Sequence, residues 1–370
     1  MSNVFAALLK LKRPIRYLIA LAFLGLLVLL LVFGIRACRS KPASSYEKGG
    51  LRVAVTESTP VVEIRNGFAV LNQGKLMAYD RTGKYMWDYT MGSSGGDIYV
   101  RSGTNLIAMW GGKDLVLLSH AGKVEFSGSM HGVIQSVRCG NEQAAVCIEG
   151  DKAILVIDRS GKTLDSISIT QGSLVNYDFT STDMMYVLTL DASGVAVRSD
   201  LSIYQAGKLL TANYTFRDEM FHSVYFDQTN LYLIGTTHLV VLPQNASIDQ
   251  AKKYVMKGWT LMDYADNGGK MGLLFASMND EGIIDKTRLK YFRDGTLTDM
   301  VLPAECMRVC VYQDKVYGIQ EQQLYIHNLR TGVQTSVSAS RQTVDVLDVF
   351  KNGCFLSRQA DGVYICELSA

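Results

Sequence analysis

Hydrophobic residues follow two different patterns along this chain. Between residues 17 and 35 they form one uncharged run of 19 residues, rich in Leu, Ile, Val, Ala and Phe and bounded by Arg16 and Arg36. From residue 51 onward they form short runs separated by Gly, Asp and Ser, with almost no helical periodicity. The first pattern predicts one long apolar helix, and the second predicts a body built of short β-strands.

The apolar run is long enough to cross a membrane as a helix. At about 1.5 Å of rise per residue, it just spans a hydrocarbon core about 30 Å thick. It exceeds the apolar region of about 7–15 residues in a cleaved signal peptide, and no clear cleavage site follows it. A lipoprotein signal is a second alternative because Ala37 precedes Cys38, although Arg36 departs from that pattern. We predict an uncleaved transmembrane helix over residues 17–35.

The flanks of this helix predict its orientation. Four basic residues precede it and four lie in the fifteen residues after it, so the positive-inside rule gives nearly a tie. Glu47 on the far side and the wholly basic N-terminal tail favour a cytoplasmic N-terminus. We expect a single-pass signal anchor that inserts into the lipid bilayer of the cell membrane. Its predicted parts are a tail (residues 1–16), the helix (17–35), a linker (36–50) and an extracytoplasmic body (51–370).

One unit recurs through the body: an apolar strand, a turn containing Asp and Gly, and a second strand. In the clearest copy, residues 76–87, the Asp80 and Thr82 side chains can accept hydrogen bonds from turn amides, and Gly83 permits a positive φ. The other copies are residues 115–126, 154–164, 195–209, 239–254, 289–297 and 324–333, with a last one beginning at residue 363.

The spacing of these copies predicts a propeller. Gly83, Gly122 and Gly161 are evenly spaced, and further strand-like runs between copies give about four short strands per unit. Four strands in about 40 residues are typical of a propeller blade. The body, residues 51–370, is long enough for eight such blades.

The two ends of the body predict how the ring closes. The last unit stops after its third strand, whereas residues 51–55 precede the first full unit. We therefore expect residues 51–55 to supply the missing outer strand of the eighth blade. The predicted fold class is all-β: an eight-bladed β-propeller closed by an N-terminal strand and preceded by one transmembrane helix.

Residues 78–87 (Ala-Tyr-Asp-Arg-Thr-Gly-Lys-Tyr-Met-Trp) resemble the repeat of the PQQ-like, quinoprotein-type eight-bladed propellers, which is marked by Ala, Asp, Thr-Gly and Trp in this order. The whole chain is similar to membrane-anchored bacterial PQQ-like families of the DUF5711 type. The quinoprotein dehydrogenases carry adjacent cysteines and calcium ligands, and this chain has no adjacent cysteines. The resemblance therefore implies the fold, and we expect no cofactor and no cofactor-binding residue.

Charge narrows the range of partners. The chain has 37 Lys and Arg and 35 Asp and Glu, but the first 50 residues contain eight of the basic residues and one acidic residue. The body thus has a net charge of −5, which argues against a nucleic-acid partner.

Sorting the predicted turns by face separates the charges further. Turns between the second and third strands of a blade lie on one face of a propeller, and turns between the third and fourth lie on the other. The first set, a candidate partner face, contains Glu149, Asp151, Asp191, Asp280, Glu281, Asp285, Glu321 and Asp361. The second set, candidate membrane-facing basic turns, contains Arg81, Lys84, Lys123, Arg159, Lys162, Lys208, Lys252, Lys253, Arg293 and Arg330. We expect the linker to enter on the basic side and to hold that side near the lipid headgroups.

Catalytic and metal-binding patterns are missing from the sequence. The five histidines lie in separate units, residues 263–269 lack the alternating ligands of a calcium loop, and the Gly-rich residues 92–96 precede no predicted helix. Two cysteine pairs, Cys139 with Cys147 and Cys354 with Cys366, flank predicted hairpin turns. They can form disulfides in an oxidising compartment or remain buried thiols.

These observations favour a non-catalytic extracytoplasmic scaffold that binds a protein or a wall polymer. A quinoprotein-like enzyme or a ligand sensor with a site in the central channel is the alternative. A signalling ectodomain is a third reading, but the tail at residues 1–16 is too short to be an output domain.

Overall fold

The computed structural model describes residues 47–51, 55–56, 58–92, 96–180, 184–205, 209–266, 268–339 and 341–368. The chain divides into two units, residues 1–44 and 45–370, and all described residues belong to the second. The tail, the expected transmembrane helix at residues 17–35 and most of the linker lie outside the described residues. Among the residues described, no helix has the length and apolar character needed to span a membrane.

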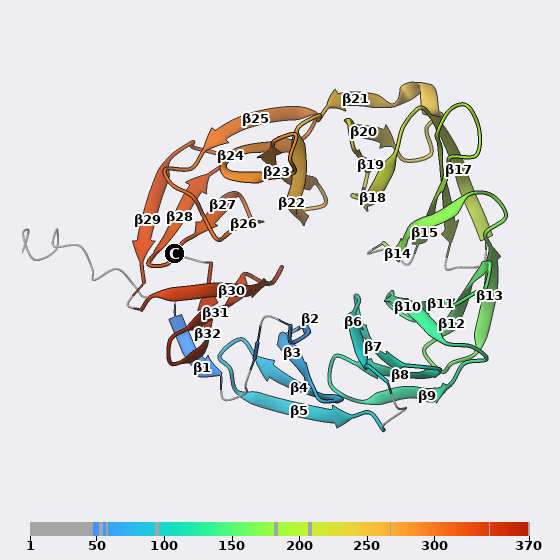
Figure 1. The fold of residues 1–370 in the computed structure, drawn as a ribbon, viewed down its shortest axis with the longest axis horizontal. Helices are drawn as coiled ribbons and strands as arrows, with labels where there is room; N and C mark the ends of the chain where they lie inside the picture. The colour runs from blue at the N-terminus through green and yellow to red at the C-terminus, as the bar shows by residue number, and fades with distance from the viewer. Residues whose placement is uncertain are drawn as a thin grey trace, which may run out of the picture. The chain divides into compact units, whose positions relative to one another are not determined.

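Eight four-stranded antiparallel sheets are arranged as the blades of a propeller (Figure 1). Blade 1 consists of β2 (Val61–Ile64), β3 (Gly67–Asn72), β4 (Lys75–Asp80) and β5 (Tyr85–Thr90), and blade 2 of β6 (Tyr99–Ser102), β7 (Leu106–Gly111), β8 (Asp114–Ser119) and β9 (Val124–Ser129). Blade 3 consists of β10 (Ile134–Cys139), β11 (Gln143–Ile148), β12 (Ala153–Asp158) and β13 (Thr163–Ser168), and blade 4 of β14 (Ser173–Phe179), β15 (Met184–Asp191), β16 (Arg198–Gln205) and β17 (Leu209–Arg217).

Blade 5 consists of β18 (Phe221–Phe226), β19 (Asn230–Gly235), β20 (His238–Pro243) and β21 (Lys252–Val255). Blade 6 consists of β22 (Trp259–Asp266), β23 (Met271–Met278), β24 (Ile284–Arg293) and β25 (Thr296–Val301). Blade 7 consists of β26 (Arg308–Tyr312), β27 (Lys315–Ile319), β28 (Gln323–Asn328) and β29 (Gln334–Ser338). Blade 8 consists of β30 (Thr343–Val349), β31 (Cys354–Gln359), β32 (Gly362–Glu367) and β1 (Glu47–Leu51), and a short 3-10 helix, Ile248–Gln250, precedes β21. The predicted all-β eight-bladed propeller is confirmed.

The recurring sequence unit is the third strand of each blade with the turn that follows it. In blade 1, Asp80 Oδ1 accepts hydrogen bonds from Thr82 N (2.8 Å), Thr82 Oγ1 (2.7 Å) and Lys84 N (3.0 Å). Asp158 forms the same three bonds in blade 3, with Ser160 and Lys162 as donors. These local bonds explain why Asp, Thr or Ser, and Gly recur in the sequence.

Two turn glycines also receive an aromatic ring from the preceding blade. A Cβ atom on Gly122 would lie 2.5 Å from Trp87 Cδ2, and one on Gly161 would lie 2.1 Å from Phe126 Cε2. Both glycines have a positive φ, at 81° and 83°. Trp87 Nε1 also donates a hydrogen bond to His120 O over 3.2 Å. The glycines are therefore needed both for the turn and for blade-to-blade packing.

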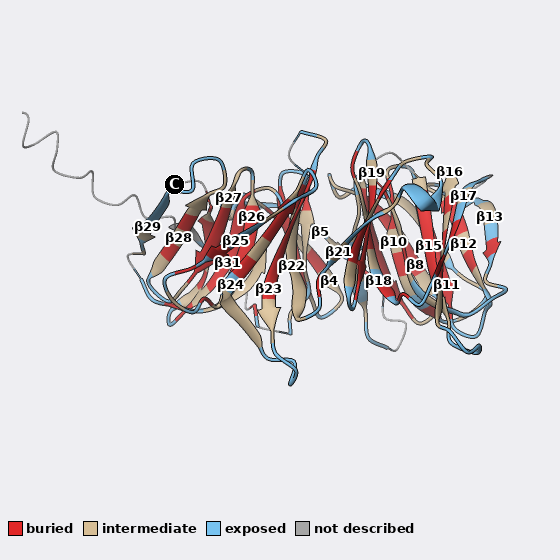
Figure 2. Cartoon of the chain, turned by 90° about the horizontal axis from the view of Figure 1, so that it is seen from above, coloured by how far each residue is buried: buried red, intermediate tan, exposed pale blue. Residues whose placement is uncertain are grey.

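The core lies between neighbouring blades. Buried residues run along the strands, and exposed residues gather in the loops at both faces (Figure 2). One cluster joins Leu106 of blade 2 to Val137 of blade 3, and another joins Phe355 of blade 8 to Tyr317 of blade 7. A further cluster joins blade 8 to Phe68 of blade 1, so side-chain packing continues between the last blade and the first.

The N-terminal strand that pairs with blade 8 differs from the expected one. β1 runs antiparallel to β32, with Leu51 opposite Val363 and Gly50 opposite Tyr364. The expected strand, residues 51–55, shares only Leu51 with β1, and residues 52–54 lie outside the described residues.

The possible disulfide between Cys139 and Cys147 does not form. Cys139 lies opposite Ala144 in the ladder and packs in the cluster between blades 2 and 3. Cys147 packs in the cluster on the other side of the same sheet, between blades 3 and 4. Because the two side chains point to opposite faces, their sulfur atoms cannot meet. Burial raises the pKa of Cys139 to about 12, so this thiol is poorly reactive.

The same geometry excludes the possible disulfide between Cys354 and Cys366. Cys354 lies opposite Glu367 and packs against blade 1, whereas Cys366 lies opposite Phe355 and packs against blade 7. All six cysteines of the described residues are buried thiols, which agrees with the alternative stated for them.

Candidate functional site

The first strand of each blade lies innermost in the ring and lines its centre (Figure 1). We call the face with the turns between second and third strands the 2–3 face. The opposite face, which carries the turns between first and second and between third and fourth strands, is the 3–4 face. Each inner strand runs from the 2–3 face to the 3–4 face, so residues late in these strands lie near the 3–4 face.

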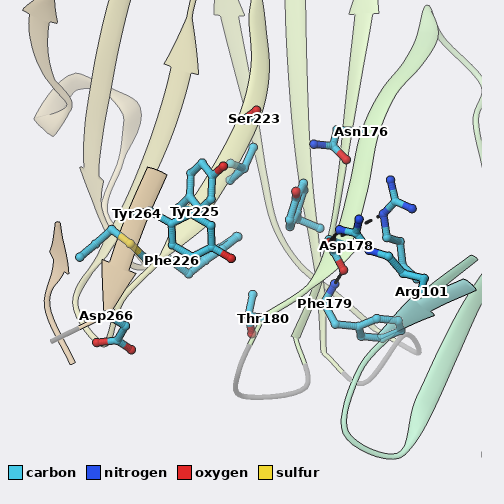
Figure 3. A pocket seen from close by; sticks show the side chains of 14 residues that line it. Arg101, Asn176, Asp178, Phe179, Thr180, Ser223, Tyr225, Phe226, Tyr264 and Asp266 are labelled. Atoms are coloured by element: carbon cyan, nitrogen blue, oxygen red, sulfur yellow. Dashed lines mark hydrogen bonds and ion pairs between the residues drawn. The ribbon is translucent and has the colours of Figure 1, made fainter. Parts of the chain in front are cut away.

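A pocket of about 370 Å³ lies among the inner strands of blades 2 to 6. Most of its charged and aromatic lining comes from one or two late residues of each inner strand. These are Arg101 of β6, Arg138 of β10, Asp178 and Phe179 of β14, Tyr225 and Phe226 of β18, and Tyr264 and Asp266 of β22, and Tyr186 of the second strand β15 adds one more ring. Figure 3 shows Arg101 and Asp178 on one side of this channel pocket and Tyr264 and Asp266 on the other.

Two guanidinium groups share one carboxylate in the channel pocket. Arg101 Nη2 and Arg138 Nε each lie 3.7 Å from Asp178 Oδ2, and Phe179 N donates a hydrogen bond to Asp178 Oδ1 over 2.8 Å. Burial raises the pKa of Asp178, and the charge of Arg101 opposes this shift. Arg138 Nε is buried without a hydrogen-bond partner. This side of the pocket therefore has an excess of positive charge and of hydrogen-bond donors.

A second network fixes the aromatic wall. Lys351 Nζ donates hydrogen bonds to Asp263 Oδ1 and to the Tyr264 carbonyl, and it lies 4.0 Å from the centre of the Tyr264 ring. Asp263 Oδ2 accepts a hydrogen bond from Val311 N over 2.8 Å. The Tyr264 and Tyr225 rings are 4.5 Å apart. Contacts from blades 5, 7 and 8 thus hold Tyr264 in place.

The channel also shifts other ionisable groups toward their neutral forms. Burial raises the pKa of Glu63 and of Asp348, and it raises the pKa of Tyr225 to about 12. Across the described segments, no group of three or more His, Cys, Asp and Glu residues can hold a metal ion. Donors, acceptors and aromatic rings that converge on a concave site are suited to binding a small polar ligand.

A family model described as "Family of unknown function (DUF5711)" matches residues 44–353. The chain belongs to this family. The resemblance stated from the sequence is thereby confirmed. No curated protein sequence matches the chain.

Solved propellers share the fold of this DUF5711 protein at low sequence identity. BamB from Moraxella catarrhalis is 11% identical with a TM-score of 0.50, covering 85% of this chain and 97% of its own. Saccharomyces cerevisiae Sqt1 is 10% identical with a TM-score of 0.55, covering 89% and 97%. AztD from Citrobacter koseri is 12% identical with a TM-score of 0.51, covering 77% and 86%. At these identities the likeness shows the fold alone.

The acidic residues named from the sequence lie where the DUF5711 propeller has its 2–3 face. Six occupy turns between second and third strands, and Asp191 and Asp285 lie in the strands beside such turns. Five of the eight have partners in the structure: Asp151 (His131), Asp191 (Ser193 and Arg198), Asp285 (Thr287), Glu321 (Gln342) and Asp361 (Arg341). The other three, Glu149, Asp280 and Glu281, are exposed, as is Glu321.

The basic turns carry less free charge than the sequence suggests. Arg159 pairs with Glu142 at 3.0 Å, and Arg293 pairs with Asp314 at 2.7 Å. Glu142 and Asp314 lie in turns between first and second strands, which share the 3–4 face and were omitted from the sequence-based sorting. Other members with ion pairs are Lys123 with Glu125 and Arg330 with Asp314.

Lys208 lies outside the described residues. Assigning Lys252 and Lys253 to a turn was wrong, because both lie within β21. Lys253 Nζ bonds the buried Glu219 carboxylate over 3.0 Å, so its charge is compensated inside the blade. Arg81 and Lys84 remain exposed at the tip of a turn.

Sequence analysis missed the channel pocket of this DUF5711 protein. It considered Asp263 only as part of a candidate calcium loop, whereas Asp263 lies in β22 and bonds Lys351. It did not single out Arg101, Arg138 or Asp178, which follow one another at intervals close to the blade period. That spacing was the available signal, because equivalent positions of successive inner strands meet in the channel.

Proposed function

We propose that this protein is a non-catalytic, membrane-anchored scaffold whose propeller lies outside the cytoplasm and binds a protein or wall polymer. The observation that carries the proposal is the set of exposed carboxylates at the tips of the turns on the 2–3 face. Glu149, Asp280 and Glu281 project from blades 3 and 6, and Glu321 projects from blade 7. Charged loops held on rigid sheets are typical sites of protein recognition.

Charge reversal on the 2–3 face tests the scaffold role. The full-length chain with Glu149→Lys, Asp280→Lys and Glu281→Lys is purified from the membranes of its native host beside the unchanged protein. We expect the variant to lose partners that the unchanged chain retains. The matched control carries Glu142→Lys, Asp294→Lys and Asp299→Lys, which lie off the 2–3 face and are expected to keep those partners. Identical partner sets for all three proteins would contradict the proposal.

The membrane anchor rests on the uncharged run at residues 17–35 and on the length of the linker. Because Glu47–Leu51 form β1, eleven residues (36–46) lie between this run and the propeller, and a flexible chain of that length has an end-to-end distance of roughly 17–20 Å. Such a linker keeps the 3–4 face, with Arg81 and Lys84, close to anionic headgroups, where each cation contributes about 1 kcal/mol.

Hydrogen exchange tests this orientation on the intact protein. The full-length chain is placed in anionic and in neutral lipid nanodiscs. We expect residues 81–84 to exchange more slowly in the anionic discs, while residues 279–283 on the other face exchange equally in both. Equal exchange at residues 81–84 in the two lipids would contradict the proposal that the 3–4 face lies near the membrane.

We further propose that the N-terminal strand closes the ring. Its support is the pairing of Gly50 with Tyr364 and of Leu51 with Val363. Gly49→Pro with Gly50→Pro removes two backbone donors and exposes the edge of β32. The double variant is expected to aggregate and to melt well below the parent, whereas unchanged melting would disprove closure.

A ligand sensor or enzyme with a site in the channel is a second candidate, because the channel pocket exists at the position that this alternative requires. Adding PQQ and Ca²⁺ to the full-length chain tests its quinoprotein form. A bound chromophore or dehydrogenase activity would favour this candidate over the scaffold.

A further inference from the structure

The channel pocket has two poles of opposite charge. Arg101 and Asp178 lie on one side and Asp266 on the other (Figure 3). Arg138 is also beside Asp178, so two guanidinium groups face one carboxylate on that side. The two basic and two acidic side chains therefore balance in number but are unevenly distributed between the two sides. A ligand with one charge would compensate one pole, whereas a ligand with both charges compensates both.

The positive pole has donors available to a ligand. Both guanidinium groups lie 3.7 Å from Asp178 Oδ2, which is beyond hydrogen-bond distance. Arg138 Nε is buried and has no hydrogen-bond partner, which is unfavourable for a polar group. The side chain of Arg101 is half-exposed toward the pocket. A ligand carboxylate between the two groups would accept charge-assisted hydrogen bonds from both.

The negative pole adjoins the aromatic wall. Asp266 Oδ1 accepts a hydrogen bond from Gly269 N over 2.8 Å, and its side chain is exposed at the end of β22. Tyr225 and Tyr264 stand beside it with ring centres 4.5 Å apart. A carboxylate beside tyrosine rings attracts an ammonium group, and the rings also favour an apolar side chain.

We propose that the channel pocket binds a small zwitterion of dipeptide size, with its carboxylate at Arg101 and Arg138 and its ammonium group at Asp266. The pocket volume of about 370 Å³ is within the range of small-molecule sites. An extended dipeptide reaches roughly 7 Å, which allows its two charged ends to contact different blades. This site goes beyond the scaffold role and does not depend on it, because the scaffold surface lies on the 2–3 face.

A matched ligand series tests the two poles by isothermal titration of the full-length chain in detergent. Alanyl-phenylalanine carries both charges, its N-acetyl derivative only the negative one, and its C-terminal amide only the positive one. We expect alanyl-phenylalanine to bind with a Kd of about 1 mM or tighter, and each derivative to bind about tenfold more weakly. Absence of binding by all three peptides, or equal affinity for all three, overturns the proposal.

Two variants assign the poles to residues. Arg101→Gln is expected to weaken alanyl-phenylalanine and its N-acetyl derivative by about tenfold while leaving the amide unchanged. Asp266→Asn is expected to weaken alanyl-phenylalanine and the amide while leaving the N-acetyl derivative unchanged. Arg81→Gln and Asp280→Asn make the same charge changes on exposed turns outside the pocket, and we expect no effect from them. Equal losses of peptide affinity in the pocket variants and the control variants overturn the proposed binding site. This outcome is independent of the partner experiment on the 2–3 face.

Discussion

The aspartates of the repeated turns and the aspartate of the channel pocket differ in where their partners lie along the chain. Asp80 is bonded by donors within its own turn, whereas the ion-pair partners of Asp178 in blade 4 come from blades 2 and 3. Hydrogen bonds from Thr82 lower the pKa of Asp80, and burial raises the pKa of Asp178. The turn carboxylate therefore stabilises the fold as an anion, while the channel carboxylate is kept at a cost to stability.

The largest expected loss of stability comes from substituting the turn glycine that packs against Trp87. In Gly122→Ala the new methyl group meets the Trp87 ring at 2.5 Å and also occupies a positive-φ position, so we expect a loss of about 3 kcal/mol. Gly332→Ala is the matched control, because Gly332 has a φ of 71° but nothing within 4 Å of its added Cβ. Its expected loss is about 1 kcal/mol. Equal losses by thermal or denaturant unfolding would mean that Trp87 does not press on the turn.

The two kinds of aspartate are expected to respond oppositely to neutralisation. Asp80→Asn weakens three hydrogen bonds to an ionised acceptor and should lower the free energy of unfolding at pH 7 by about 1 kcal/mol, after allowance for solvent screening. Asp178→Asn keeps an acceptor for Phe179 N and removes a buried charge, so this substitution should not lower the free energy of unfolding. Denaturant unfolding of both variants at pH 7 measures these two changes in the free energy of unfolding. A larger loss for Asp178→Asn would show that Arg101 and Arg138 more than compensate the burial of this carboxylate.

The same contrast predicts the pH dependence of stability. A carboxyl whose folded pKa is lowered contributes stability above its unfolded pKa of about 3.9, and this contribution is lost as the pH falls through the folded pKa. Asp80 and Asp158 are of this kind. A carboxyl with a raised folded pKa, such as Asp178, contributes below the unfolded pKa and loses that contribution as the pH rises.

Unfolding measured from neutral pH down to strongly acidic pH should separate the two classes. The Asp80→Asn, Asp158→Asn double variant should lose less stability than the parent on acidification. Asp178→Asn should lose more, because it lacks a group that favours the folded state when protonated. Parallel pH curves for all three proteins would contradict the assignments.

The sequence predicts features whose partners are close along the chain better than features whose partners come from distant blades. Asp80, Thr82 and Gly83 form a turn through local bonds, so the motif and its regular recurrence lead to the correct blade number. The predicted acidic turns also fall on one face, since that depends only on strand order. The channel pocket depends on side chains that five blades bring together, and no short segment contains enough of them to indicate a site. For the cysteines the sequence left disulfides and buried thiols open, and the side-chain alternation along each hairpin, which sends the two thiols to opposite faces, decides for buried thiols.

An effect as small as that of Asp80→Asn is expected for the ring that covers Gly122. Trp87→Phe keeps an aromatic ring over the glycine and loses the hydrogen bond from Nε1 to His120 O, so we expect a loss of about 1 kcal/mol. The next junction already works this way, because Phe126 covers Gly161 without an indole N–H group. Trp87→Ala removes the ring itself and should cost several times more, since it leaves a gap between blades 1 and 2. If Trp87→Phe proves as costly as Trp87→Ala in the same unfolding assay, the hydrogen bond rather than ring packing holds this junction, and Phe126 would need another explanation.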